Sequence, residues 1–284
     1  MITRLGVVGA GLMGSGIAEV SSRRGINVVV VEASQSAVDR ARNRITKSIE
    51  RGVRSGKLSS EERDAALARI TFDTDLSAIA DSQLVVEAVI EEEQTKLDIF
   101  RRIDEVVADP KAILASNTSS IPIMKLGMAT KRPESVVGIH FFNPVPVMPL
   151  VELVTSLLTD PGTAETANRF AADQLGKHVI LSKDRAGFIV NALLIPYILS
   201  AIRMFESGFA TAEDIDTGMV DGCAHPMGPL ALADLIGLDT TMAVAESLYS
   251  EFKEPLYAPP PLLSRMCEAG LLGRKTNRGF YQYD

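Results

Sequence analysis

The stretch Gly9-Ala10-Gly11-Leu12-Met13-Gly14 decides the fold of this chain. It fits the pattern Gly-x-Gly-x-x-Gly, which alone is a weak signal, because a tight turn without a ligand can produce it. Here the apolar run Leu5–Val8 directly precedes it, a helical pattern over Ser15–Arg24 follows, and Glu32 closes the next apolar run, Val28–Val31. This order predicts the first strand–helix–strand unit of a dinucleotide-binding sheet.

Each glycine of this loop has a predicted role. Gly9 makes the turn, Gly11 lets the pyrophosphate of a cofactor approach the backbone, and Gly14 lets the helix pack closely on the strand. The N–H groups and positive dipole end at the helix N-terminus would bind the phosphates. The loop residues that we expect to contact the cofactor are Gly9, Gly11, Leu12, Met13 and Gly14.

Glu32 indicates which dinucleotide is bound. A carboxylate at this place can accept hydrogen bonds from the adenosine ribose, and it would repel a 2′-phosphate. We therefore expect NAD rather than NADP, unless a nearby arginine offsets the repulsion. The competing interpretation is a solvated glutamate at the end of a strand.

Composition and charge exclude several classes of protein. The chain has 284 residues, 46% of them hydrophobic and 23% charged, which predicts an ordinary globular protein of two domains. Its net charge of −7 argues against a nucleic-acid binder. The two cysteines, Cys223 and Cys267, form no CxxC pair, which favours a reducing compartment, and we expect the cytoplasm. The three histidines are too dispersed to predict a metal site.

One apolar segment, Phe188–Phe205, approaches the length of a membrane span. It contains Asn191, Pro196 and Arg203, and the chain has no second such segment. A helix buried on all sides, in a core or in a dimer interface, is the better interpretation. We therefore expect no membrane association and a homodimer formed through the C-terminal helical domain.

The chain changes character near residue 183. Before it, short β-rich runs alternate with helical patterns, which predicts a Rossmann-type doubly wound α/β sheet over residues 1–183 with a helical insertion at about 35–80. After it, only helical patterns follow, so we expect an all-α domain over residues 184–284. The predicted strands are Leu5–Val8, Val28–Val31, Leu84–Val89, Ala112–Ala115, Val136–Phe142, Leu150–Val154 and His178–Leu181. The predicted helices of the second domain are Gly187–Glu206, one beginning after Thr211, Gly228–Ile236, Thr240–Phe252 and Pro261–Ala269.

His140 and Glu152 lie on neighbouring runs joined by the short loop Pro144–Pro149. If this loop makes an antiparallel turn centred on Pro146, residue 140 stands opposite residue 152. The imidazole could then take a hydroxyl proton while the carboxylate fixes its tautomer and stabilises its charged form. A histidine that is merely satisfied within the core is about as good an interpretation from the residues alone.

Several further motifs, in order and over essentially the whole chain, resemble those of the L-3-hydroxyacyl-CoA dehydrogenases, and most closely the bacterial 3-hydroxybutyryl-CoA dehydrogenases. Besides the glycine loop, they are Val85-Val86-Glu87-Ala88, Leu114–Ser120, the nine residues HFFNPVPVM from His140, Gly187–Asn191, Asp214-Ile215-Asp216, Pro226–Pro229 and Gly279-Phe280-Tyr281. The resemblance implies a Rossmann domain followed by a helical domain, and oxidation or reduction at the 3-position of an acyl-CoA with NAD.

The resemblance also implies roles at matched positions. His140 would be the general acid/base and Glu152 its partner, while Ser119 and Asn191 would position the 3-oxygen of the substrate and the imidazole. Asn143 would contact the cofactor or substrate side of the same pocket. The residues that would lie beside the cofactor are Glu91, Lys96 and Lys275. Taken singly, Glu91 and Lys96 would instead indicate a solvated helix face, and Asn191 a hydrogen bond at a helix start.

The insertion carries a basic stripe on its first predicted helix, Gln35–Arg54, which a second predicted helix, Ser60–Ala68, follows. The stripe spans about 80° of the helix at 100° per residue. It consists of Arg40, Arg44, Lys47, Arg51 and Arg54, opposite an apolar side of Val38, Ala41, Ile45, Ile49 and Val53. A solvated face is the bland interpretation, but the phosphates of coenzyme A need cationic partners. The candidate substrate contacts are Ser48, Arg51, Arg54 and Lys57.

Two other functions stay open from the sequence. The same scaffold could oxidise a hydroxy acid or sugar acid without coenzyme A. The chain could also be a catalytically silent NAD-binding protein of the crystallin kind, although packing alone does not require Ser119, His140, Glu152 and Asn191 together.

Overall fold

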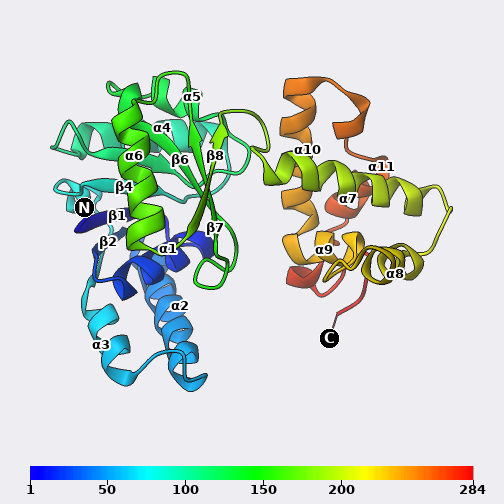
Figure 1. The fold of residues 1–284 in the computed structure, drawn as a ribbon, viewed down its shortest axis with the longest axis horizontal. Helices are drawn as coiled ribbons and strands as arrows, with labels where there is room; N and C mark the ends of the chain where they lie inside the picture. The colour runs from blue at the N-terminus through cyan, green and yellow to red at the C-terminus, as the bar shows by residue number, and fades with distance from the viewer. Residues whose placement is uncertain (284) are drawn as a thin grey trace. The chain divides into compact units, whose positions relative to one another are not determined.

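A computed structural model of the chain describes residues 1–283, which divide into two compact units, the first over Met1–Asp184 and the second from Arg185 onward. The first unit is built on an eight-stranded sheet and the second is helical, as the fold-class prediction required (Figure 1).

The strands of the first unit follow the order β3-β2-β1-β4-β5-β6-β7-β8. All neighbouring pairs are parallel except β6 and β7, which are antiparallel. The strands are β1 (Arg4–Val8), β2 (Asn27–Val31), β3 (Ile70–Asp73), β4 (Leu84–Glu87), β5 (Ile113–Ser116), β6 (Val136–Phe141), β7 (Leu150–Thr155) and β8 (His178–Lys183). The strand order reverses its direction of growth beside β1, so the carboxyl ends of β1 and β4 flank the crevice where such sheets bind ligands.

All seven predicted strands are present, and β3 is one that the sequence analysis did not expect. It has only four residues, and it pairs with β2 through Val28 opposite Ile70. Its residues alternate in burial, whereas the central strands β4, β5 and β6 are buried throughout. A short edge strand that directly follows a helix gives too weak a periodic signal to be recognised.

Helices cover both faces of the sheet. Figure 1 shows α1 and α6 on one side of the strands and α4 and α5 on the other, as right-handed crossovers require. These helices are α1 (Leu12–Arg23), α4 (Glu93–Val106), α5 (Ile123–Met128) and α6 (Pro161–Arg169), with the shorter turns η1 (Leu76–Ile79), η2 (Pro133–Ser135) and η3 (Phe170–Gln174). The predicted insertion forms the helix pair α2 (Gln35–Arg54) and α3 (Ser60–Ala68), and α2 buries Val38, Ala41, Ile45 and Ile49.

The second unit contains the five predicted helices with small changes at their ends. They are α7 (Val190–Glu206), α8 (Ala212–Cys223), α9 (Pro229–Ile236), α10 (Leu238–Phe252) and α11 (Pro261–Glu268), with the short turns η4 (Pro255–Tyr257) and η5 (Arg274–Thr276). The helix α7 begins three residues later than predicted, because Gly187 and Phe188 have positive φ angles of 73° and 49° and cannot continue a helix.

The helix α7 was expected to be buried on all sides, in a core or in a dimer interface. Within the single chain it is only partly buried. Ile195, Ile198 and Ile202 are buried, but Leu193 is 74% exposed and Met204 is 43% exposed. No helix within residues 1–283 is long and apolar enough to cross a bilayer.

Two buried carboxylates stabilise the second unit. Asp216 accepts the N–H groups of Leu230 and Ala231 at the start of α9, and it also accepts the Tyr281 hydroxyl. A Cβ at Gly228 would lie 2.2 Å from the Asp216 Cβ, so this glycine is required for the contact.

Asp234 accepts the N–H groups of Phe280 and Tyr281 and the hydroxyl of Tyr283. Gly279 lies against Asp234, as Gly228 lies against Asp216. The three sequence motifs around Asp216, Gly228 and Gly279 are therefore explained by packing within the second unit.

Candidate active site

The glycine loop fits a dinucleotide. Gly9 has a φ of +84°, and a Cβ at Gly14 would lie 1.9 Å from the Gly9 carbonyl oxygen, so both glycines are required by the turn and by the close packing of α1. A Cβ at Gly11, in contrast, would meet no atom within 4 Å, which leaves open space where a ligand can approach the backbone. No side chain caps α1, so its first N–H groups, those of Leu12 and Met13 included, can bind phosphate.

Glu32 follows β2 and lies beside this loop. Its Oε1 accepts the N–H of Ala10 at 2.6 Å, and its Oε2 accepts the N–H of Ala33 at 3.3 Å. The carboxylate is therefore fixed next to the first turn of the loop, where the adenosine ribose of a dinucleotide binds in such folds. Its contact with the ribose stays a prediction.

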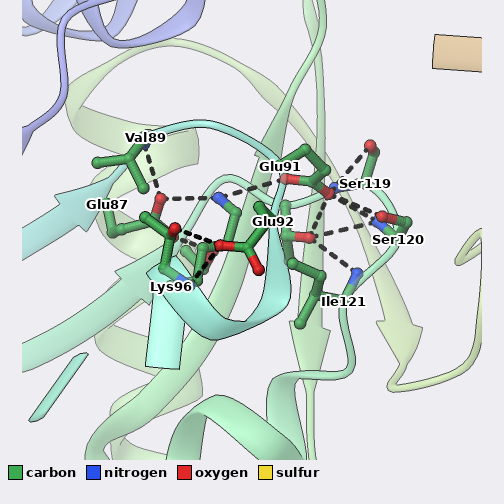
Figure 2. A network of polar contacts seen from close by, with 11 residues as sticks. Glu87, Val89, Glu91, Glu92, Lys96, Ser119, Ser120 and Ile121 are labelled. Atoms are coloured by element: carbon green, nitrogen blue, oxygen red, sulfur yellow. Dashed lines mark hydrogen bonds and ion pairs between the residues drawn. The ribbon is translucent and has the colours of Figure 1, made fainter. Parts of the chain in front are cut away.

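A buried ion-pair network follows β4 (Figure 2). Lys96 of α4 is fully buried, and its Nζ lies 2.7 Å from Glu87 Oε1 and 3.2 Å from Glu91 Oε2. Glu87 is also fully buried, and it accepts the Ser116 hydroxyl at 2.6 Å. The interpretation of Lys96 as part of a solvated helix face is wrong, because its ammonium is the central cation of this network.

Glu91 holds the loop that carries Ser119. Its Oε1 accepts the Thr118 hydroxyl at 2.5 Å and the backbone N–H groups of Ser119 and Ser120 at 2.8 and 3.0 Å (Figure 2). Burial alone would raise the pKa of Glu91, but Lys96 and these hydrogen bonds outweigh it and lower the pKa. The carboxylate therefore stays charged at neutral pH, and the segment after β5 is fixed by it.

His140 and Glu152 form the pair that the register argument predicted. His140 of β6 stands opposite Glu152 of β7, and its Nδ1 lies 2.7 Å from Glu152 Oε2. Glu152 is fully buried and His140 is 7% exposed, with the Phe142 ring 4.6 Å from the imidazole between centroids. A buried carboxylate on Nδ1 fixes the orientation and the tautomer of the ring.

The loop that joins these strands is itself held in place. Lys177 is buried and donates from Nζ to the carbonyl oxygens of Val145 and Met148, at 2.6 and 2.7 Å. Burial and the nearby Arg23 and Arg24 lower the pKa of this ammonium. Lys177 was not predicted from the sequence, because its contact with the distant loop depends on the folded chain. Asn143 lies in the same loop and is exposed.

Two predicted residues lie in the second unit. Asn191 is in the first turn of α7, as predicted. Lys275 lies in η5 and pairs with Asp239 of α10. Their roles beside the substrate and the cofactor stay predictions.

Every member of the basic stripe of α2 is exposed, Arg44 included. Arg51, Arg54 and Lys57 are exposed, and Ser48 is half-buried. On the opposite side, Val53 is only half-buried, so the buried stripe ends one turn earlier than predicted. Arg44 donates from Nη1 to the carbonyl oxygen of Ala10 in the glycine loop, at 2.9 Å.

Comparisons with known proteins agree with this geometry. The family model for the 3-hydroxyacyl-CoA dehydrogenase NAD-binding domain matches residues 4–185, and the model for the C-terminal domain matches residues 187–283. A Mycobacterium tuberculosis 3-hydroxybutyryl-CoA dehydrogenase is 60% identical over 282 residues, which cover 99% of this chain and 99% of that protein. The crystal structure of M. tuberculosis FadB2 superimposes with a TM-score of 0.98 at 59% identity, over 100% of this chain and 99% of that one.

A further solved structure, the (S)-3-hydroxybutyryl-CoA dehydrogenase PaaH1 of Ralstonia eutropha, is 45% identical. It covers 100% of both chains with a TM-score of 0.95. These matches confirm the resemblance that the motifs indicated.

Proposed function

The chain belongs to the 3-hydroxyacyl-CoA dehydrogenase family, and from this premise we propose that it interconverts (S)-3-hydroxybutyryl-CoA and acetoacetyl-CoA with NAD. The observation that carries the proposal is the buried His140–Glu152 pair at the carboxyl end of β6, with the glycine loop at the carboxyl end of β1 in the same sheet. The names of the relatives support the four-carbon substrate.

His140 acts as the general acid/base in this proposal. With Nδ1 held by Glu152, Nε2 is the ring nitrogen that takes the proton of the 3-hydroxyl during oxidation and returns it during reduction. The Glu152 carboxylate stabilises the imidazolium that forms and keeps the ring oriented. Since Glu152 is fully buried, water does not screen this interaction.

Ser119 and Asn191 position the 3-oxygen of the substrate. Ser119 is suited to this role because its backbone N–H donates to Glu91, which fixes the position of the backbone that carries its hydroxyl. The Asn191 amide can donate a hydrogen bond to the same oxygen, and its place in the first turn of α7 orients it.

NAD supplies the hydride acceptor or donor when it is bound. Gly9, Gly11 and Gly14 shape its pyrophosphate site, and the N–H groups of Leu12 and Met13 bind it. Glu32 accepts the ribose hydroxyls and disfavours a 2′-phosphate. The residues that we place beside the cofactor are Glu91, Lys96, Asn143 and Lys275, of which Lys96 acts through its ion pair with Glu91 because it is fully buried.

The exposed cations of the insertion bind the phosphates of coenzyme A. Arg51, Arg54 and Lys57 are exposed without a carboxylate partner among residues 1–283, and Ser48 lies on the same helix. A positively charged surface in a chain of net charge −7 attracts a polyanionic substrate over roughly the Debye length, about 10 Å at 0.1 M salt.

We further propose a cytoplasmic homodimer formed through the second unit, with that unit also contributing to substrate binding. The exposed apolar side chains of its helices support this proposal, among them Leu193, Met204 and Leu235, which are 74%, 43% and 48% exposed.

The test is NADH oxidation with acetoacetyl-CoA, compared with longer 3-ketoacyl-CoA substrates and with free acetoacetate. We expect the highest kcat/KM with acetoacetyl-CoA. Equal turnover of free acetoacetate would replace this function by a hydroxy-acid dehydrogenase. NADH binding without any turnover would indicate a silent NAD-binding protein.

A further inference from the structure

Both backbone polar groups of Ala10, the second residue of the glycine loop, are hydrogen-bonded to side chains. Its N–H donates to Glu32 at 2.6 Å. Its carbonyl oxygen accepts the Ser15 hydroxyl at 2.7 Å and the Arg44 guanidinium at 2.9 Å. Ser15 is buried, and its hydroxyl lies 3.5 Å from the same Arg44 nitrogen.

Arg44 comes from α2, outside the strand–helix–strand unit that defines the cofactor site. The other basic side chains of the stripe form no hydrogen bond or ion pair with any of residues 1–283, and they are Arg40, Lys47, Arg51 and Arg54. Arg44 is exposed like the rest of the stripe, but it differs from the other members because one of its guanidinium N–H groups donates to the loop.

This contact has two physical consequences. The guanidinium fixes the orientation of the Ala10–Gly11 peptide group, and hence the direction of the Gly11 N–H. It also places a positive charge on the carbonyl side of the same residue whose N–H binds the Glu32 carboxylate. A guanidinium has five donors, so contact with one carbonyl oxygen leaves donors for a phosphate or a ribose oxygen.

We propose that Arg44 is a cofactor-binding residue contributed by the insertion, and that it opposes Glu32 in the choice between NAD and NADP. Arg44 attracts the cofactor phosphates and orders the loop, whereas Glu32 repels a phosphate on the 2′-oxygen. The insertion is then part of the NAD site as well as of the proposed coenzyme A surface.

The first test measures NADH binding to the substrate-free protein by fluorescence titration, so it does not depend on the identity of the acyl-CoA. Arg44→Ala should weaken binding about tenfold, the usual scale for a lost charged contact. Arg44→Lys keeps the charge and should recover part of the loss. Lys47→Ala removes a charge from the same helix without touching the loop, and its NADH Kd should stay within about twofold of the wild-type value.

The Tm of each apo variant distinguishes a folding defect from a local loss of binding. Weaker NADH binding with an unchanged Tm shows that the substitution acts at the binding site. If Arg44→Ala binds NADH as tightly as Lys47→Ala does, the proposal is wrong.

The second test is a cofactor-choice cycle. Glu32→Ala should gain NADPH binding, and adding Arg44→Ala should weaken NADPH binding about a hundredfold, clearly more than the roughly tenfold loss expected for NADH, because the 2′-phosphate then also lacks its cationic partner. A purely structural arginine would weaken NADH and NADPH by the same factor in the Glu32→Ala background. That equal loss would overturn the assignment of Arg44 to cofactor choice.

Discussion

The sheet unit and the helical unit both bury carboxylates, but they surround them with different partners. In the sheet unit, Glu87 and Glu152 contact other titratable side chains, Lys96 and His140. In the helical unit, Asp216 and Asp234 contact backbone N–H groups and tyrosine hydroxyls. A carboxylate whose partner can itself change charge is suited to chemistry, whereas one that satisfies N–H groups holds the chain in place.

The tyrosines of the helical unit show the same difference. Burial and the hydrogen bond to Asp234 raise the pKa of Tyr283 to about 12, and burial and Asp216 raise the pKa of Tyr281 further. Both phenols thus stay protonated over any working pH and serve only as donors. Variants at these buried carboxylates and at their partners test the difference between the two units.

The largest effect is expected from His140→Ala in the sheet unit. It should lower kcat at least about a hundredfold with acetoacetyl-CoA, the usual scale for losing a general acid/base, while the NADH Kd is nearly unchanged. Glu152→Gln should lower kcat less, because the imidazole remains but loses its charged partner. Near-normal turnover by His140→Ala would remove the pair from the mechanism.

A second variant tests the architectural side of the comparison. Asp234→Asn replaces an acceptor of three hydrogen bonds by an amide, and it should lower the free energy of unfolding by about 1–3 kcal/mol. The NADH Kd should stay at the wild-type value. The matched control is Glu268→Gln, which loses only an exposed pair with Arg265 and should leave the Tm nearly unchanged. A changed NADH Kd in Asp234→Asn would show that Asp234 affects cofactor binding as well as stability, which would contradict the distinction between the two units.

Charge reversal at Arg51, Arg54 and Lys57 together should raise the KM for acetoacetyl-CoA about tenfold and leave the NADH Kd alone. The wild-type KM should also rise with added salt, since these exposed charges are screened. An unchanged KM in the triple variant would make this surface a solvated helix face, and coenzyme A would bind elsewhere.

The smallest effect concerns Glu91 and pH. Because its pKa is lowered in the folded chain, the stability that it contributes is complete above the unfolded value of about 4.3 and is lost as pH falls through the lower folded value. The Tm difference between the wild type and Glu91→Gln should therefore be constant from pH 7 to about 5 and shrink in more acidic solution. A difference that changes most near neutral pH would show that Glu91 is not held charged by Lys96 and the Thr118–Ser120 segment.

The sequence was sufficient wherever one residue type or one period dominates. The glycine loop, the insertion helices and the opposition of His140 and Glu152 follow from spacing alone, because strand register and turn geometry leave few alternatives. Contacts between distant segments could not be predicted. Nothing in the spacing shows that Arg44 turns to Ala10, or that Lys96 is buried against Glu87, since both depend on how side chains meet in three dimensions.

The antiparallel pairing of β6 and β7 has a consequence for how such a protein can be altered. Both members of the acid/base pair come from one hairpin, so their spacing is set by a ladder of neighbouring peptide groups and not by remote parts of the chain. Successive side chains of a strand point to opposite faces of the sheet, so the pair depends on strand register. Side chains around the cofactor can be exchanged without retuning the pair, but a single residue inserted within β7 before Glu152 would turn its carboxylate to the other face of the sheet.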